Sequence, residues 1–548
     1  MRNYTILTAL LATLSLSGVT GKAATDEALA RMDGDIIGRF HFVGTERIAA
    51  DPHAVGLNGL GALPATAELR DKTLDKLATT PFRLFQQKLA NHNTNDFAPL
   101  IRPLLDDLLR NESYAEMRGP TNAVPELMLA VHLGNDRAIL WQSYLSTVLS
   151  SWTGIRVQPI KGDGFTGWEL RKHHDPNLIR FLRVGDWVLF GWGWDELKLQ
   201  PSFLQRIKNT KRPVEVAKND WLDVLVDWPS YLAHHPITLP SPLPAKLPKM
   251  HLTVQGRKEV SLQGEKDYVR PKLTMLFPEP LGLMLEPWRI PTNTIHNPMV
   301  SFTVARGIAP WLSAIPAVKA LHPSSVPNQL CIWAMGQVPY ETSVTAPMTG
   351  ASNYVAELEP RLVAILNAFL KVHPAPALTE AVWMNNRVLV KGLPVVTPDL
   401  HGMREPAGDF LMGGLFPAAF RSNAPPFPKE LLREILSKPN LVYYDWEMNK
   451  ERIDQWRSLE QVYLVSAGRP MPGIGLPGQK WLQAAKGKMI NCGTEVTLTA
   501  PNELTLLRNA PVGLTGFELN LLEYWLDAPE FPLHVKYPPP TRPMLRKP

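Results

Sequence analysis

Cysteine is scarce in this chain of 548 residues, which contains only Cys331 and Cys492. Two cysteines exclude a fold held together by many disulfides, and they exclude a metal site built from cysteine ligands. Cys331 lies in an apolar segment that reads as a strand, and Cys492 lies at the start of another. A single disulfide closing a long loop and a pair of buried free thiols both fit this pattern.

Long apolar runs and catalytic signatures are also missing. After the first 24 residues no 18-residue stretch is uninterruptedly apolar, and the nearest candidate, residues 273–288, is broken by three prolines and two glutamates. We therefore expect no transmembrane segment in the mature chain. The sequence lacks the nucleophile-elbow, Ser-x-x-Lys, phosphate-loop and His-Glu-x-x-His motifs, so it favours a protein that is not an enzyme and predicts neither metal nor cofactor.

Charge is nearly balanced, with 57 basic and 51 acidic residues and a formal net charge of +6. The basic residues are scattered, apart from a short Pro-rich basic tail at the C-terminus, residues 531–548. A nucleic-acid-binding domain concentrates its basic residues on one face or helix. We therefore expect no nucleic-acid partner.

The first 23 residues have the layout of a secretory signal peptide. Arg2 precedes a short apolar core over residues 5–17, and Gly21-Lys22-Ala23 places small residues at positions −3 and −1 of a cleavage site. This layout predicts cleavage after Ala23 and export. The expected location is the bacterial periplasm or cell envelope, or the extracellular medium.

Proline divides the remaining chain. Five of the 52 prolines fall within residues 235–249, which predicts a stiff connector over residues 236–249. We expect a first α+β unit with N-terminal helices over residues 24–235 and a second α+β unit over residues 250–530.

Short segments of the two halves resemble each other. Residues 185–191 match residues 408–414, and Val226-Asp227-Trp228 matches Tyr444-Asp445-Trp446. Leu133-Gly134 and Arg306-Gly307 each precede a helical segment. These matches predict an α+β fold of two related units, each a mainly antiparallel sheet covered by helices, after an N-terminal helical segment.

An aromatic strip is the candidate binding surface. Alternation along a strand places Phe190, Trp192 and Trp194 on one face, flanked by glycines. Such a strip can stack on sugar rings or on a partner's apolar side chains. The alternative is a sheet core beneath the helix expected over residues 201–209.

Asp227 and Asp445 are the candidate acid pair for a hydrolase. Glycoside hydrolysis uses two carboxylates about 5–10 Å apart. The alternative role for each aspartate is capping of the turn or helix that follows its strand. The adjacent histidines at 173–174 and 234–235 point to opposite faces of an extended chain, so we expect exposed loop residues rather than metal ligands.

Taken together, these features predict an exported bacterial envelope or periplasmic protein with a non-enzymatic binding or scaffold role. Its partner would be an envelope protein or polymer that the sequence does not identify. The alternative is a secreted hydrolase that cleaves cell-wall or extracellular carbohydrate through paired carboxylates. No motif in the chain resembles that of a characterised family.

Overall fold

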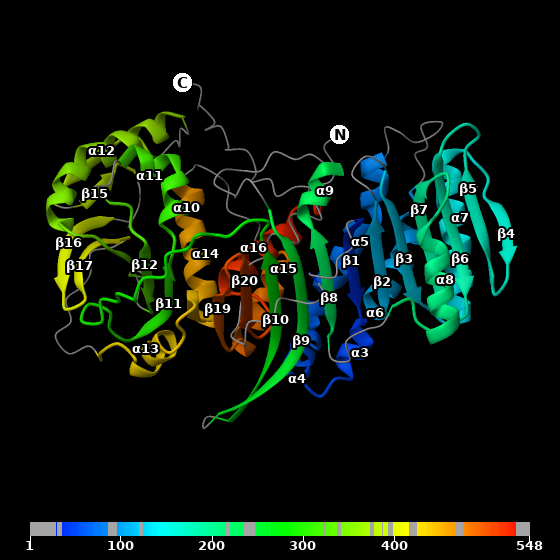
Figure 1. The fold of residues 1–548 in the computed structure, drawn as a ribbon, viewed down its shortest axis with the longest axis horizontal. Coiled ribbons are helices and arrows are strands. Elements are labelled where there is room, and N and C mark those ends of the chain that lie inside the picture. Colours follow the sequence, from blue (N-terminus) through cyan, green and yellow to red (C-terminus); the bar gives the residue numbers. More distant parts are fainter. Residues whose placement is uncertain are drawn as a thin grey trace, which may run out of the picture.

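A computed structural model shows a mixed α+β fold built on one continuous antiparallel sheet (Figure 1). It describes residues 29, 35–85, 96–119, 124–214, 220–234, 247–261, 264–321, 325–336, 341–372, 378–385, 387–392, 398–415, 425–466 and 475–532. The predicted signal peptide, most of the predicted linker and most of the basic tail lie outside the described residues. The α+β class and the antiparallel pairing are confirmed.

The first ten strands come from residues 36–276. They are β1 (Ile36–Phe42), β2 (Ser113–Arg118), β3 (Glu126–His132), β4 (Gln158–Gly162), β5 (Phe165–Arg171), β6 (Asn177–Val184), β7 (Trp187–Trp194), β8 (Leu222–Asp227), β9 (Lys249–Ser261) and β10 (Gly264–Leu276). Their hydrogen-bonded order is β4-β5-β6-β7-β3-β2-β1-β8-β9-β10. This half therefore places its first strand well inside the sheet and adds strands on both sides.

The second ten strands come from residues 299–509. They are β11 (Met299–Arg306), β12 (Gln329–Met335), β13 (Thr342–Pro347), β14 (Ala381–Met384), β15 (Arg387–Val390), β16 (Asp399–Glu405), β17 (Gly408–Gly414), β18 (Leu441–Met448), β19 (Asn491–Ala500) and β20 (Glu503–Asn509). Their order is β14-β15-β16-β17-β13-β12-β11-β18-β19-β20. Counted from its own first strand, each half thus has the same strand order.

The two halves share one sheet, which differs from the expectation of two. β10 pairs antiparallel with β20 over five residues, from Lys272 opposite Leu507 to Leu276 opposite Glu503. Each half would otherwise end in an exposed edge strand, and an unpaired edge readily pairs with another strand. Apart from Leu29, which is helical, the described helices of the first half follow β1, so a helical segment ahead of the sheet is not confirmed.

Helices cover the two faces of the sheet. In the first half they are α3 (Thr45–Ala49), α4 (Val55–Gly61), α5 (Pro64–Phe85), α6 (Ala98–Arg110), α7 (Asn135–Thr153), α8 (Leu199–Thr210) and α9 (Trp228–His234). In the second they are α10 (Ala309–Ala314), α11 (Pro316–Leu321), α12 (Ala351–Val372), α13 (Lys429–Leu436), α14 (Asn449–Ser466), α15 (Pro477–Ala485), the 3₁₀ turn η3 (Lys486–Lys488) and α16 (Gly516–Asp527). We call the face that carries α8 and α13 the front face, and the face that carries α6, α7, α14 and α16 the back face.

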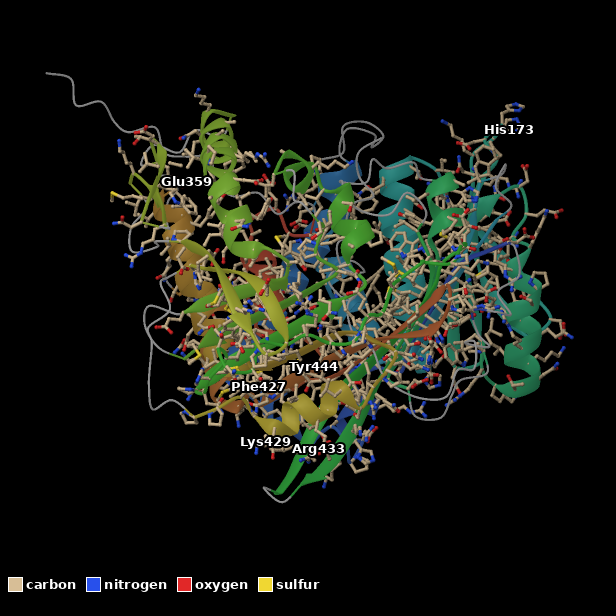
Figure 2. All side chains as sticks on the ribbon, turned by 60° about the vertical axis from the view of Figure 1, so that its left-hand side comes forward. His173, Glu359, Phe427, Lys429, Arg433 and Tyr444 are labelled. Atoms are coloured by element: carbon tan, nitrogen blue, oxygen red, sulfur yellow. The ribbon has the colours of Figure 1, made fainter. Side chains whose placement is uncertain are left out.

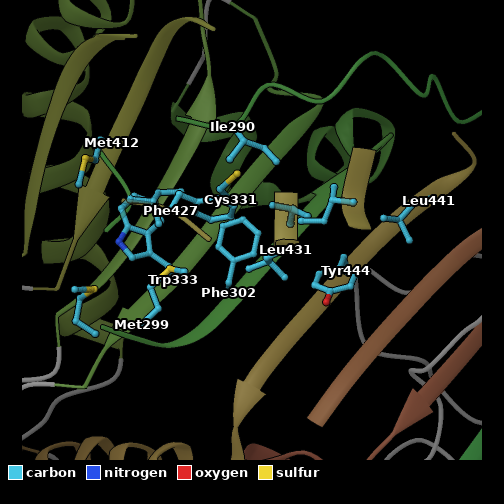
Figure 3. Packing of buried hydrophobic residues seen from close by; sticks show 14 residues of the cluster. Ile290, Met299, Phe302, Cys331, Trp333, Met412, Phe427, Leu431, Leu441 and Tyr444 are labelled. Carbon is cyan, nitrogen blue, oxygen red and sulfur yellow. The ribbon is translucent and has the colours of Figure 1, made fainter. Parts of the chain in front are cut away.

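The front face of the second half is an apolar core (Figure 3). Phe302 and Trp333 lie opposite each other on β11 and β12, and both are almost fully buried. Leu431 and Ile435, one helical turn apart on α13, pack onto this surface. Figure 2 shows Lys429 and Arg433 of α13 on the outer side of the helix. The helix is thus amphipathic, and it closes this core.

Candidate oxyanion site on strand β2

Strand β2 carries a line of polar side chains on the front face of the first half. Alternation along the strand gives Tyr114, Glu116 and Arg118 the same face, and Glu112 continues the line just before the strand begins. The Tyr114 ring lies 5.5 Å from the ring of Phe203 on α8. Helix α8 therefore packs beside this line.

Glu126 on β3 determines where α8 begins. Its carboxylate accepts hydrogen bonds of 2.8 Å from the backbone amides of Lys198 and Leu199. The first amides of a helix have no partner within the helix, and a carboxylate there also interacts favourably with the helix dipole. The start of α8 is thereby tied to the sheet, and its last turns are brought next to β2.

Glu116 is the centre of what we call the Glu116 cluster. Its side chain is fully buried and accepts a 2.5 Å hydrogen bond from the Tyr114 hydroxyl and another from Arg118 Nε. Arg39 Nε on β1 lies 3.6 Å from Glu116 Oε2, and Arg206 Nη2 on α8 lies 3.9 Å from the same oxygen. Three guanidinium groups from three elements therefore converge on one carboxylate.

The electrostatics of the Glu116 cluster favour an additional negative charge. Burial alone would raise the pKa of Glu116, but the hydrogen bonds from Tyr114 and Arg118 and the arginine charges outweigh it and lower that pKa. Glu116 is thus ionised, and Glu126, opposite Arg118 in the β2–β3 pair, is a second carboxylate beside the three arginines. Because about a third of each arginine side chain is exposed, the remaining positive charge is accessible from solvent.

The guanidinium groups of Arg39 and Arg206 are incompletely paired. Arg39 Nε, Arg206 Nε and Arg206 Nη2 are buried and have no hydrogen-bond partner among the described residues. The Arg206 guanidinium lies over the Phe203 ring at 4.6 Å, which holds it in place. A buried donor without an acceptor is unfavourable. The exposed third of each side chain leaves part of the guanidinium charge open to a carboxylate, phosphate or sulfate.

A second group, the Glu112 cluster, lies at the other end of the same line. His41 Nε2 is 3.0 Å from Glu112 Oε1, while Arg47 and Arg212 lie 3.7 and 3.8 Å from Glu112 Oε2. Burial alone would raise the pKa of Glu112, yet the hydrogen bond from His41 and the nearby arginines lower it overall. About half of the Arg47 and Arg212 side chains is exposed.

The corresponding strand pair of the second half is apolar at this position. Arg39 lies opposite Glu116 in the β1–β2 pair, whereas Phe302 lies opposite Trp333 in the β11–β12 pair. The two pairs occupy the same place in the strand order of their halves. One scaffold position thus supports an apolar core in one half and a half-exposed group of arginines in the other.

The predicted aromatic strip does lie on one face of β7, but this is the back face. Phe190 packs into the apolar cluster beneath α6 and α7, Trp192 is half-buried, and 47% of Trp194 is exposed. Helix α8 covers the opposite face, where the missing side chains of Gly191 and Gly193 make room for Leu197. Phe190 is thus half-buried against the core, and the helices on its face are α6 and α7 rather than α8.

Asp227 and Asp445 are brought to separate places. They lie on β8 and β18, which are five strand spacings apart in the sheet, or about 24 Å. Asp227 Oδ1 accepts a hydrogen bond from the backbone amide of Ser230 at the start of α9, so Asp227 has the capping role. Asp445 lies within its strand and accepts a 2.6 Å hydrogen bond from Thr303. This separation is incompatible with an acid pair that acts on one glycosidic bond.

Cys331 and Cys492 are free and buried. They lie on β12 and β19, three strand spacings or about 14 Å apart, whereas a disulfide requires Cα atoms within about 7 Å. Burial raises the pKa of Cys331 to about 12 and also raises that of Cys492. Of the two patterns that fit the sequence, the structure has the pair of buried thiols.

The adjacent histidines 173 and 174 lie at the surface. His173 and His174 lie in the turn after β5, and both are exposed. Figure 2 shows His173 at the periphery of the molecule. Within the described residues, no three His, Cys, Asp or Glu side chains are grouped so that they could hold a metal ion.

A buried polar network surrounds Asp445 on the back face. Glu447 lies two residues further along β18 and accepts a 2.5 Å hydrogen bond from the backbone amide of Gly516. Arg508 on β20 is almost fully buried and donates to Glu518 of α16 at 2.5 Å. This network lies beneath α14 and α16 with its side chains buried, so it joins the helices to the sheet rather than forming an open site.

The network makes stability depend on pH. Burial, followed by repulsion from Asp445, raises the pKa of Glu447 from 4.5 to about 7. An acid whose pKa is raised by folding stabilises the native state most when protonated, so this contribution is lost as pH rises from about 4.5 through about 7. We expect Glu447→Gln to retain the Gly516 contact and to lose less stability between pH 5 and pH 8 than the wild type.

Urea unfolding at several pH values checks this expectation, and Glu380→Gln is the matched control because half of that side chain is exposed. An unchanged slope of stability against pH in Glu447→Gln would show that Glu447 does not titrate in this window. Burial also raises the pKa of Glu523, to about 6, so part of the slope persists in the variant.

Sequence reasoning missed the Glu116 and Glu112 clusters. The available signal was the alternation of charged residues through Glu112, Glu116 and Arg118, which is unusual for a strand in the middle of a sheet. The partners on β1 and α8 are 77 or more residues away in sequence from Glu116. No local pattern connects them.

Two further findings concern the chain as a whole. Among the described helices, none is both long and apolar enough to span a bilayer. The chain matches no protein-family model, no curated protein and no solved structure.

Proposed function

We propose that this chain is an exported binding protein that holds an oxyanion group of its ligand at the Glu116 cluster. The observation that carries the proposal is the convergence of Arg39, Arg118 and Arg206 on one buried carboxylate, with donor nitrogens of Arg39 and Arg206 left without an acceptor. Arginine suits this role because its planar fork matches a carboxylate or phosphate.

A binding role accounts for these features better than hydrolysis does. Asp227 caps a helix and Asp445 belongs to a buried network, so neither acid is free to act on a substrate. Glu116 is held ionised by its hydrogen bonds and by the arginines, which suits a counter-ion rather than a proton donor.

The shared strand order of the two halves supports an internal duplication, which belongs to the same proposal. Of the two matching segments, residues 185–191 span the turn before β7 and the first part of β7, and residues 408–414 form β17. Each of these strands is the seventh of its half. The Asp-Trp matches fall on β8 and β18, each the eighth. Leu133-Gly134 and Arg306-Gly307 do not support it, since they follow the third and the first strand respectively. The first unit then carries the site, and the second repeats the scaffold.

The test is calorimetric titration of the mature chain with inorganic phosphate, sulfate and tripolyphosphate. We expect at least one of these probes to bind, and we expect Arg39→Gln and Arg206→Gln each to weaken binding by about tenfold or more. This estimate follows from the loss of one charge-assisted hydrogen bond, about 1.5–3 kcal/mol.

Arg404→Gln is the matched control, because 91% of that arginine side chain is exposed and it lies on β16 in the other half. The proposal fails if none of the three probes binds. It also fails if the Arg39 and Arg206 variants bind as tightly as the Arg404 variant.

A further inference from the structure

The Glu112 and Glu116 clusters lie on one line, and their spacing is informative. Glu112 and Glu116 are four residues apart along extended chain, a separation of about 13 Å. Each glutamate is surrounded by arginines from other elements. A single small oxyanion contacts one cluster, and a longer molecule is needed to contact both.

We call the surface formed by the arginines of the Glu112 and Glu116 clusters the positive strip. Acidic residues on and just before β8 limit its width on the side away from α8. Asp223 on β8 lies opposite His41 in the β1–β8 pair and is 3.4 Å from His251 of β9. Asp220 lies nearby, and its pKa is raised by burial and then by repulsion from Asp223. The arginines are thus confined between α8 on one side and these aspartates on the other. A strip about two strand spacings wide, or roughly 10 Å, accommodates one extended chain.

The strip as a whole has surplus positive charge. Five arginines, at positions 39, 47, 118, 206 and 212, face the ionised Glu112 and Glu116, and Glu126 adds a third carboxylate opposite Arg118 in the β2–β3 pair. Each cluster keeps a surplus, so each favours an oxyanion of its own. Two linked oxyanion contacts raise the overall affinity because the second binding event becomes intramolecular.

From this arrangement we infer that the ligand is a linear polyanion, a single chain bearing phosphate or carboxylate groups, which runs along β2 and contacts both clusters. This inference rests on the proposed function and extends it from one oxyanion to a chain. A membrane surface or a nucleic-acid duplex presents its charges over a greater width than the strip and would meet the aspartates of β8.

The experiment compares tripolyphosphate with a much longer linear polyphosphate, using the wild type and the double variant Arg47→Gln/Arg212→Gln. We expect the wild type to bind the longer chain at least about tenfold more tightly per chain than tripolyphosphate. We expect the double variant to keep tripolyphosphate binding at the Glu116 cluster and to lose that gain. Arg47→Lys/Arg212→Lys should recover part of it, because the charges are retained.

Each outcome has a distinct meaning. Binding of tripolyphosphate without any gain for the longer chain overturns the polyanion inference and leaves the proposed function intact. Absence of binding by both probes overturns both. Equal or tighter binding of duplex DNA or of anionic lipid vesicles overturns the single-chain inference. Oligogalacturonate of matched charge completes the set: tighter binding than polyphosphate identifies carboxylates as the oxyanions, and weaker binding identifies phosphates.

Discussion

Substitution of Arg508 by methionine is expected to lower the free energy of unfolding by about 3–5 kcal/mol. Arg508 is 3% exposed and donates to Glu518, to Thr494 and to the backbone carbonyl of Gly513. Its charge also compensates Asp445, which is buried and whose pKa is raised mainly by that burial. Methionine fills a similar volume but leaves these carboxylates without their cation.

The position of Glu518 explains why the loss extends beyond one ion pair. Glu518 forms a capping box with Thr515 at the start of α16, in which each side chain accepts a hydrogen bond from the other residue's backbone amide. Without Arg508, its carboxylate has to gain a proton or a water partner, and the attachment of α16 to the sheet weakens.

Urea unfolding followed by circular dichroism measures the effect, with Arg404→Met as the exposed control. The double variant Arg508→Met/Glu518→Leu should recover part of the loss, because it removes the uncompensated charge together with its partner. A loss below about 1 kcal/mol in Arg508→Met would mean that the network is solvated and that Arg508 is not its main counter-ion.

The sequence predicted those elements of the fold that depend on residues close together in the chain. Alternation and turn residues indicate β7 and β17, because each strand follows a Gly-Asp or Glu-Pro-Ala-Gly turn and has an apolar face. The capping role of Asp227 is local as well, since its partner Ser230 is three residues away. The class of the fold follows from many such elements.

The joining of the halves was not predictable in this way. β10 and β20 are separated by more than 200 residues, and their pairing joins the edge strands of the two halves. The match between Asp227 and Asp445 was misleading for a similar reason. The dipeptide recurs, but Asp227 ends its strand next to α9, whereas Asp445 lies four residues before α14. A shift of a few residues changes which side chains share a face.

The candidate site was missed because its charges look ordinary in the sequence. Arg39, Glu116 and Arg206 are scattered along the first half, and scattered charges normally indicate solvated surface. Their convergence is a product of the β1–β2 register and of the position of α8, which Glu126 anchors. Position in the tertiary structure, rather than residue type, identifies them.

Phe302→Ala and Arg39→Ala test whether the two halves use the same scaffold position differently. Phe302 has no exposed surface, and its ring packs edge-on against Phe427 at 4.9 Å. Its truncation leaves a cavity in the core of the second half, so we expect a loss of about 3–5 kcal/mol. Arg39 is partly exposed, and Glu116 keeps its hydrogen bonds from Tyr114 and Arg118 without it.

Arg39→Ala is therefore expected to cost no more than about 1 kcal/mol in unfolding free energy while it weakens oxyanion binding. Urea unfolding of both variants measures their stability, and calorimetric titration measures their affinity for the oxyanion. A residue that serves stability and a residue that serves binding respond in opposite ways to these two measurements. Phe302→Ala should therefore reduce stability and have little effect on affinity in the molecules that remain folded. Equal losses of stability would show that the Glu116 cluster is a structural ion-pair network, and the binding role would then have to be sought elsewhere on the sheet.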